Sequence, residues 1–447
     1  MPRAVVVLPI VLGTLTCTLS NNIVNVPLNQ IMRDLRVPLS RGALVVVAFG
    51  LATAVMMPIA GWLADRFGRR RVYLSAVALI GLTSCGASLA PTLPVLVMFR
   101  VLQALAAAST LPAAMGILTE LYGIEERGRG LGLWAAANGL GQAVGPPVGG
   151  LITGWLSWRW IFMPTISLSV VAFGLAALVV PRDRGQSARL DWLGASTLTG
   201  GAGLLVAAVT IVPQVGVDSP AVFALAAGGI VVLAGFARTL RTHREPFVNP
   251  GLFREPSYLR STFGVFTQMF CLGGMLLAVP LYLIKGLHHS TTTAGLVVFA
   301  LPAAMTVLAP AAGRAARGTR TRHALRAGLL VLAAGQVLLA VLLGTWAHTT
   351  AGIAMALVVA GIGTAFVQAP AATGATRSAL GRGGTGLGLF NLVRFAGSAL
   401  GAAWGAIALS GGRHYGLVFV VCAVVAVIGL AGTLTRAPAP TPVAAGR

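Results

Sequence analysis

Residues 61–71 read Gly61-Trp62-Leu63-Ala64-Asp65-Arg66-Phe67-Gly68-Arg69-Arg70-Arg71. The stretch joins two apolar runs, near 43–63 and 72–90, and carries one acid among its arginines. The glycines permit a tight turn at a membrane face, and the acid can pair with an arginine or cap a helix. We therefore expect this loop to latch neighbouring helices together in one conformational state. Its candidate gating residues are Gly61, Asp65, Arg66, Gly68, Arg69 and Arg70.

Similar apolar runs recur along the whole chain. They fall near 4–27, 43–63, 72–90, 94–119, 129–154, 160–180, 191–213, 219–240, 258–284, 292–313, 325–346, 350–374, 384–409 and 414–435. A helix needs about 20 apolar residues to cross a bilayer, and these runs lack the alternation of barrel strands. Charged residues make up only 9% of the 447 residues. We predict an all-α polytopic membrane protein with fourteen transmembrane helices and contacts to membrane lipid.

The formal net charge of +22 comes almost entirely from arginine, since Lys285 is the only lysine. Most arginines lie in short segments between alternate apolar runs, and far fewer lie in the intervening loops. Cytoplasmic loops of membrane proteins carry such an excess. The pattern therefore predicts a multi-pass protein with both termini in the cytoplasm, and it assigns the charge to membrane topology and not to nucleic-acid binding.

The chain lacks the sequence signatures of several other function classes. Cys17, Cys85, Cys271 and Cys422 each stand alone in an apolar run, so no metal or redox site is expected. There is no G-x-x-x-x-G-K-[ST] loop for an ATP-driven pump, and no G-x-S-x-G or H-E-x-x-H motif for a membrane enzyme. We expect no enzyme activity and no cofactor. The first apolar run is expected to be a membrane span and not a signal peptide.

An internal repeat predicts the domain organisation. Gly130-Leu131-Gly132-Leu133-Trp134 recurs as Gly386-Leu387-Gly388-Leu389-Phe390. The fifth run thus corresponds to the thirteenth, a displacement of eight that fits two six-helix bundles in pseudo-two-fold relation with two helices inserted between them. The expected divisions are 1–181 for the first bundle, 182–245 for the inserted pair, 246–436 for the second bundle and 437–447 for a disordered tail. Chance similarity between Gly/Ala-rich spans is the alternative.

Two motifs lie inside predicted spans. Arg100-Val101-Leu102-Gln103-Ala104 places a guanidinium in the fourth span, which is costly and typical of a functional pathway, although a snorkelling arginine is the alternative. In the fifth span, small residues and prolines follow one another, which favours close helix approach and bending. The candidate gating residues of that span are Gly141, Gly145, Pro146, Gly149 and Gly150.

Taken together, these motifs resemble those of the major facilitator superfamily. Residues 61–71 are similar to its signature loop, and residues 100–104 resemble its R-x-x-Q-G element with Ala104 in place of glycine. The stretch Gly141–Gly150 resembles the antiporter element G-x-x-x-G-P-x-x-G-G. With the inserted pair, the resemblance extends to the fourteen-spanner drug/proton antiporter family. It implies alternating access by two rocking bundles, with substrate expelled as protons enter.

One departure from that family concerns the acids. Its first-span segment carries an acid where this chain has Ser20, and every acid of the chain falls in a loop or at a predicted helix end. A buried cation without a counter-charge is unfavourable, so we expect a neutral or anionic amphipathic substrate. The candidates for proton coupling are Arg100, Asp65 and Glu120.

By the family's fold, spans one, four, nine and twelve should line a central cavity. The candidate substrate-binding residues are Asn22, Asn25, Arg100, Gln103, Gln268, Gln368 and Arg394, with Phe266, Met269 and Phe270 as adaptable apolar contacts.

We therefore expect a monomeric secondary transporter of the bacterial inner membrane that exports drugs or antibiotics, with a small molecule and protons as its partners. Export or import of one endogenous metabolite, and a non-transporting sensor on the same fold, are the alternatives. The preference for Arg, Ala, Gly and Val over Lys, Asn and Ile is typical of a GC-rich bacterial source.

Overall fold

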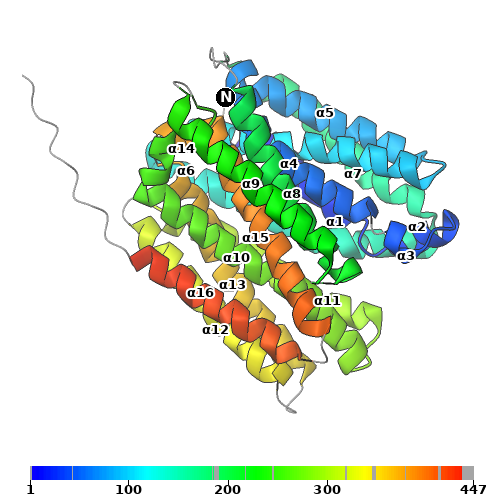
Figure 1. The fold of residues 1–447 in the computed structure, drawn as a ribbon. Helices are drawn as coiled ribbons and strands as arrows, with labels where there is room; N and C mark the ends of the chain where they lie inside the picture. Colours follow the sequence, from blue (N-terminus) through cyan, green and yellow to red (C-terminus); the bar gives the residue numbers. More distant parts are fainter. Residues whose placement is uncertain are drawn as a thin grey trace, which may run out of the picture.

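The computed structural model describes residues 3–434 except 43, 184, 186–190, 217, 244–245, 318–319, 345–348, 378 and 411–413. Long helices lying side by side make up this part of the chain (Figure 1). The predicted tail, 437–447, lies outside the described residues.

The first elements are α1 (Arg3–Asn22), α2 (Leu28–Asp34), α3 (Leu39–Gly42), α4 (Leu44–Phe67), α5 (Arg69–Ser88), α6 (Leu93–Trp155), η1 (Trp158–Phe162) and α7 (Met163–Val179). They are followed by α8 (Trp192–Val215) and α9 (Pro220–Thr242). The last elements are η2 (Pro250–Arg254), α10 (Pro256–Leu281), η3 (Tyr282–Gly286), α11 (Thr291–Ala315), α12 (Arg320–Gly344), α13 (Thr350–Ala375), α14 (Ala379–Arg382), α15 (Gly384–Ser410) and α16 (Tyr415–Leu434).

Thirteen helical segments of the described chain are long and apolar enough to cross a membrane. One of them is α6, which covers two predicted spans, 94–119 and 129–154. Its 63 residues would extend about 95 Å if straight, about three times the hydrocarbon thickness. Gly123 interrupts the helix with a φ of 66°, a conformation that glycine adopts without steric cost. The count of fourteen spans stays a prediction.

The first span is shorter than the sequence pattern predicted. The apolar run extends over 4–27, but α1 ends at Asn22 and turns follow before α2. Pro27 lacks the backbone N–H that would continue the helix, and its ring clashes with the preceding turn. The exposed Asn25 consequently lies beyond the helix.

Helices of residues 3–179 and helices of residues 256–434 pack against each other along two seams. In residues 3–179, α1 and α5 each pack against α6 and α7; in residues 256–434, α10 packs against α15 and α16, and α12 against α13 and α16. The seams between these N-terminal and C-terminal parts are α6 with α11 and α4 with α15. Glycines face each other there: Gly128 and Gly132 approach Gly313, and Gly61 approaches Gly384. Such small residues allow backbones to touch.

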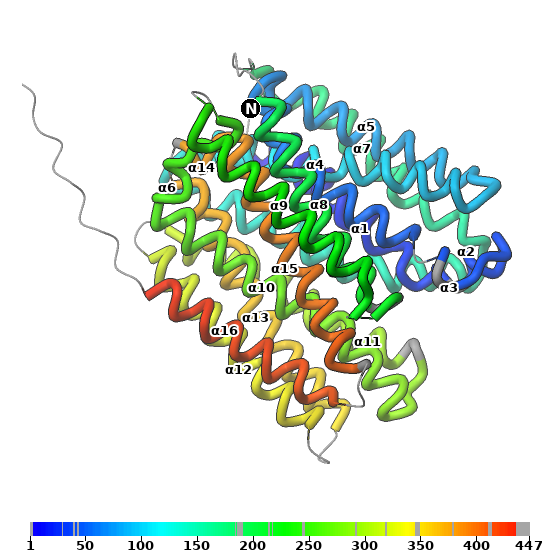
Figure 2. Tube along the Cα trace, viewed as in Figure 1, coloured from blue at the N-terminus to red at the C-terminus, as the bar shows by residue number. Residues whose placement is uncertain are grey.

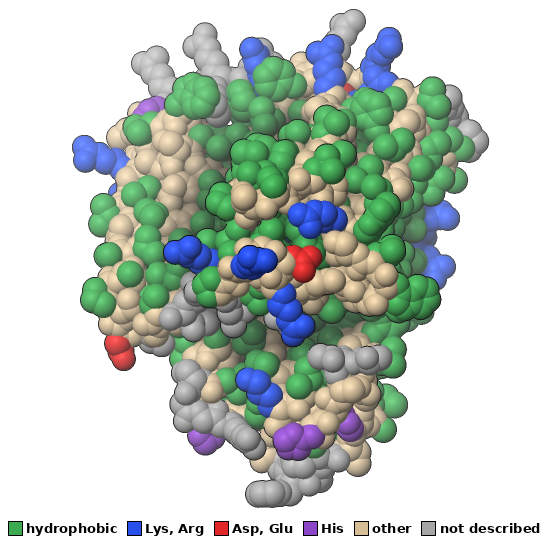
Figure 3. Space-filling view, turned by 90° about the vertical axis from the view of Figure 1, so that its right-hand side faces the viewer, with side chains coloured by type: hydrophobic (Ala, Val, Ile, Leu, Met, Phe, Trp, Pro, Cys, Tyr) green, Lys and Arg blue, Asp and Glu red, His purple; other side chains and the backbone are tan. Residues whose placement is uncertain are grey.

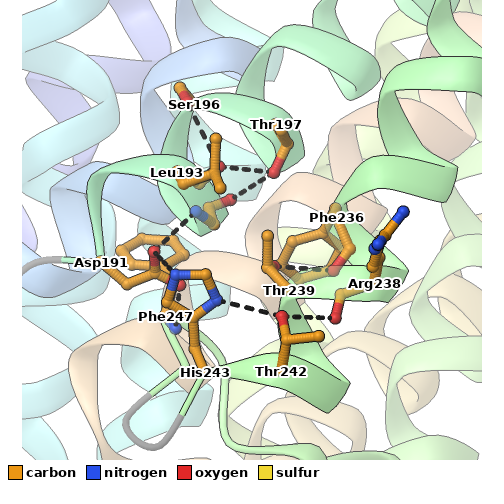
Figure 4. Close-up of polar contacts among 11 residues, drawn as sticks. Asp191, Leu193, Ser196, Thr197, Phe236, Arg238, Thr239, Thr242, His243 and Phe247 are labelled. Atoms are coloured by element: carbon orange, nitrogen blue, oxygen red, sulfur yellow. Dashed lines mark hydrogen bonds and ion pairs between the residues drawn. The ribbon is translucent and has the colours of Figure 1, made fainter.

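The pair α8–α9 stands beside the second seam, where α8 contacts both α4 and α15 (Figure 2). Asp191 ties its start to the chain that follows α9 (Figure 4). The Asp191 carboxylate accepts hydrogen bonds from the backbone N–H of Gly194, at 2.9 Å, and of Phe247, at 3.1 Å. The His243 Nε2 atom lies 4.0 Å from the same carboxylate.

Large apolar side chains are exposed on the outer faces of the spans, for example Leu82, Val231 and Val307. Figure 3 shows many hydrophobic side chains on one face of the molecule, with Lys and Arg more frequent there than Asp and Glu. Such surfaces suit a lipid solvent, in which apolar side chains face outward at no cost.

Candidate functional site

A cavity of about 100 Å³ lies between α1, α4, α6, α10 and α15. Its lining comprises Cys17, Thr18, Asn21, Asn22, Phe49, Thr53, Ala107, Leu111, Asn138, Gln142, Met269, Leu272, Leu276, Arg394, Phe395 and Ser398. Sites for small molecules occupy about 300–1,000 Å³, so the cavity must widen to admit a typical ligand.

The lining combines aromatic and aliphatic side chains with amides and hydroxyls, which suits an amphipathic ligand. Its one charged side chain is Arg394, and no carboxylate belongs to it within the described part of the chain.

Arg394 comes from α15 and is 3% exposed. Its Nη2 atom lies 3.4 Å from the Asn138 side-chain oxygen, and its guanidinium stands 5.3 Å from the ring centre of Trp134 and 5.6 Å from that of Phe395. The Nε and Nη1 atoms have no hydrogen-bond partner among the described residues. A guanidinium with donors to spare can bind a carboxylate or phosphate through two parallel hydrogen bonds.

Arg100, the other arginine inside a span, lies outside this cavity lining and is 0% exposed. Its Nη1 atom donates to the backbone oxygen of Ser20 at 2.7 Å and to the Gln103 side-chain oxygen at 2.6 Å, and its Nε donates to the Val45 backbone oxygen at 3.3 Å. The guanidinium lies 4.2 Å from the ring centre of Phe49, which lines the cavity. Arg100 therefore joins α1, α4 and α6 and holds one cavity wall in place.

The remaining predicted binding residues divide into three groups. Asn22 and Met269 line the cavity, and Gln103 is occupied with Arg100 and with Ser84, 2.6 Å away. Gln268 and Gln368 are buried outside the lining, and their side-chain amides have no partner among the described residues.

Phe266 and Phe270 lie next to each other outside the lining, with ring centres 6.4 Å apart and ring planes tilted by 31°. The twelfth predicted span, 350–374, corresponds to α13 and was expected to line the cavity. None of the described lining residues belongs to α13.

Sequence reasoning missed several lining residues. Thr18, Phe49 and Thr53 look like ordinary membrane-span residues, and nothing in the sequence distinguishes them. A signal existed for Asn138 and Gln142, since they share one face of the fifth span with Gly145 at helical spacing.

The loop 61–71 brings the N-terminal and C-terminal parts together. The Asp65 carboxylate accepts a hydrogen bond from the backbone N–H of Gly384, the first residue of α15, at 2.6 Å. Arg69 pairs with Glu120 at 2.5 Å and donates to the Arg382 backbone oxygen at 3.0 Å. Asp65 thus caps a helix of the other part, as the sequence allowed.

Asp183 supports the same loop. Its carboxylate accepts hydrogen bonds from the backbone N–H groups of Arg69 and of Arg70, the latter at 3.1 Å. Gly68 precedes α5 with a φ of 92° and lies against Asp183, so glycine is needed at that position. Arg66 is exposed at the end of α4.

A second contact between the two parts lies nearby, where the Arg127 guanidinium donates to the Thr376 backbone oxygen. We call the end of the molecule that carries Arg69, Arg127 and Arg326 the arginine-rich end. On α1 the cavity begins at Cys17, about 21 Å from Arg3, and extends to Asn22 at the far end. This conformation is therefore closed at the arginine-rich end, and its cavity occupies the opposite half.

The fifth-span glycines pack α6 against α1. Gly141 contacts Thr18, Gly145 contacts Asn22 and Gly149 contacts the backbone oxygen of Ile23. A Cβ atom at Gly145 would lie 2.9 Å from that of Asn22, too close for a normal contact. The element therefore positions the α1 residues of the cavity wall. Pro146 and Gly150 are partly buried in the same helix.

Comparisons with known proteins agree with this architecture. The sequence profile of the Major Facilitator Superfamily matches residues 10–402 and, separately, residues 263–446. The human organic anion transporter MFSD10 has the same fold, with a TM-score of 0.73 and 16% identity over 97% of this chain and 100% of that one. The proton:xylose symporter XylE gives a TM-score of 0.70 and 14% identity, covering 98% and 96%.

Three bacterial relatives are similar in sequence. Multidrug resistance protein Stp of Mycobacterium tuberculosis is 30% identical over 395 residues, which cover 88% of this chain and 73% of Stp. Puromycin resistance protein pur8 of Streptomyces alboniger is 32% identical over 337 residues, covering 74% and 66%. Multidrug export protein EmrB of Haemophilus influenzae is 29% identical over 306 residues, covering 68% and 60%. The chain is a multi-pass membrane transporter that belongs to the Major Facilitator Superfamily.

Proposed function

We propose that this transporter exports small neutral or anionic amphipathic compounds from the bacterial cytoplasm by alternating access. One observation carries the proposal: the cavity holds the guanidinium of Arg394 and lacks any described carboxylate. A lipophilic cation bound there would meet a like charge in a low-dielectric setting, which costs free energy. An anionic or neutral ligand would satisfy the open donors of Arg394.

Two observations support export as the direction of transport. The fifth-span element packs α6 closely on α1, and this element resembles that of exporters. The relatives named above carry the words multidrug resistance, puromycin resistance and multidrug export. We propose drug or antibiotic efflux on this basis.

For the mechanism, we propose two rocking units, 1–181 and 246–436, with 182–245 as an inserted pair, in a monomer of fourteen spans with both termini in the cytoplasm. The contacts made by Asp65 and Arg127 close the arginine-rich end in the present conformation. They must break for the cavity to open toward that end, which is cytoplasmic in the proposed topology.

We propose proton antiport in which the proton binds a carboxylate that does not line the cavity. Asp65 and Glu120 both take part in contacts at the closed end, so protonation of either carboxylate would weaken those contacts. Arg100 is the third candidate, and its contacts with α1 and α4 support an indirect role.

Uptake into inside-out vesicles tests the proposal, because the cytoplasmic face of the membrane is outside in such vesicles and export appears as accumulation in the lumen. Uptake would be measured under an imposed pH gradient, with and without an uncoupler. We expect wild-type protein to move a neutral or anionic fluorescent compound in a way that the uncoupler abolishes. The same measurement on Arg394→Gln tests the contribution of this arginine. Movement of one endogenous metabolite and no other compound favours the specific exporter, whereas movement of nothing favours a sensor and contradicts the proposal.

A further inference from the structure

A groove of about 490 Å³ runs between α12 and α16 on the outer surface of the C-terminal part. It is lined only by aliphatic side chains: Val337, Ala340, Val341, Val420, Ala423, Val424, Val427 and Ile428. Both helices are candidate membrane spans, so the groove faces hydrocarbon. Its shape and composition suit an acyl chain.

Arginine side chains stand between the same two helices at the arginine-rich end. Arg326 donates from Nη2 to the Thr433 backbone oxygen at 2.8 Å, and Arg322 donates to the Thr433 and Leu434 backbone oxygens at 3.1 and 3.2 Å. These acceptors are neutral carbonyls at the end of α16. Among the described residues, Arg326 forms no ion pair, and its buried Nε has no hydrogen-bond partner.

The aliphatic groove and Arg326 lie on the same face of α12. Eleven residues separate Arg326 from Val337, which places their side chains within about 20° around α12 and about 16 Å apart along it. Between them, Leu330 is exposed on the same face. On α16, Ile428 precedes Leu434 by six residues, or about 9 Å. The cationic end and the apolar groove therefore form one continuous surface whose length matches a phospholipid headgroup and its chain.

We propose that an anionic phospholipid binds here, with its phosphate at Arg326 and Arg322 and one acyl chain in the groove between α12 and α16. Basic sites between transmembrane helices at the cytoplasmic leaflet attract anionic headgroups. A second protein copy would bury the aliphatic groove but leave the Arg326 charge without compensation, which is why the lipid is the better occupant.

Native mass spectrometry of the purified full chain tests the site directly, without relying on transport. Phosphatidylglycerol and phosphatidylethanolamine with identical chains are added separately, and glycerol phosphate serves as the headgroup without chains. The variants are Arg326→Gln, Arg326→Lys, the pair Arg322→Gln/Arg326→Gln, and Val424→Phe, which fills the groove. Val231→Phe on the exposed face of α9 is the matched control for Val424→Phe, and melting temperatures check folding.

We expect wild-type protein to retain phosphatidylglycerol in preference to phosphatidylethanolamine. Each arginine contributes about fivefold in affinity, so the double variant loses about 25-fold, and Arg326→Lys retains most of the binding because it keeps the charge. Val424→Phe should weaken phosphatidylglycerol binding, whereas Val231→Phe should not, and glycerol phosphate should not displace the lipid. Equal retention of both lipids, unchanged binding in a folded double variant, or a bound second copy in place of lipid would overturn the proposal.

Discussion

The contact between Asp65 and Gly384 should stabilise the conformation closed at the arginine-rich end, because it joins parts that separate when this end opens. A hydrogen bond to a charged group contributes about 1.5–3 kcal/mol, and a neutral one about 0.5–1.5 kcal/mol. Asp65→Ala therefore shifts the equilibrium toward opening by about 10- to 150-fold. Asp65→Asn keeps an acceptor and loses about 1 kcal/mol, roughly fivefold.

Electron–electron double resonance between spin labels measures this shift. Labels at Arg71 and Leu380, both exposed at the arginine-rich end, report the separation of the two parts, with the exposed Cys85 replaced by serine. Glu126→Gln is the matched control, since its partner Arg3 lies in the same part at 2.6 Å and exposed pairs contribute only about 0–1 kcal/mol. Identical distance distributions for wild type and Asp65→Ala, or a larger shift for Asp65→Asn, would refute the reasoning.

Five further substitutions, of which Gly150→Ala and His243→Ala are controls, separate structural roles by their effect on thermal unfolding. Arg100→Lys should lower the melting temperature by several degrees, because an ammonium cannot reproduce the fork that reaches two helices. Gly149→Val should cost about 1–3 kcal/mol through overpacking against α1, whereas Gly150→Ala should be nearly neutral. Asp191→Ala should cost about 1 kcal/mol by removing a helix cap, while His243→Ala should change stability by less than about 0.5 kcal/mol, since its contact is long and partly exposed.

Each of these expectations has a contrary outcome. A fully stable Arg100→Lys protein would show that the buried fork is dispensable. Equal melting temperatures for Gly149→Val and Gly150→Ala would contradict close packing of α6 on α1. A His243→Ala variant as unstable as Asp191→Ala would show that the ion pair, and not the cap, holds the start of α8.

The architecture was largely predictable because it rests on long-range composition. The apolar runs indicated a helical membrane protein, and the motifs at residues 61–71 and 141–150 resembled those of the superfamily to which the chain belongs. The orientation from the arginine asymmetry and the two-bundle plan from the repeated Gly-Leu-Gly-Leu stretch stay predictions. Helix ends were less accessible, since hydropathy continues to residue 27 while Pro27 ends the helix earlier. The junction inside α6 was predictable, because the hydropathy pattern ends one run at residue 119 and begins the next at 129, and Gly123, which interrupts the helix, lies between them.

The site was predictable only in part. Arg100 and Arg394 look alike in the sequence as arginines within apolar runs, yet only Arg394 lines the cavity, whereas Arg100 lies outside the lining and donates from Nε and Nη1 to backbone oxygens and to Gln103. That difference depends on tertiary packing. The partner of Asp65 was likewise out of reach, because a backbone N–H at residue 384 carries no sequence signature.

The central claim, that Arg394 makes the cavity selective for neutral and anionic ligands, is tested most directly by equilibrium binding. Dissociation constants would be measured on purified wild-type protein and Arg394→Gln for a series of analogues sharing one aromatic body and bearing a carboxylate, no charge or two ammonium groups. We expect wild type to bind the carboxylate most tightly and the dication least, and Arg394→Gln to lose about tenfold or more for the carboxylate alone. Tighter binding of the dication by wild type, or an unchanged carboxylate affinity in the variant, would contradict the account.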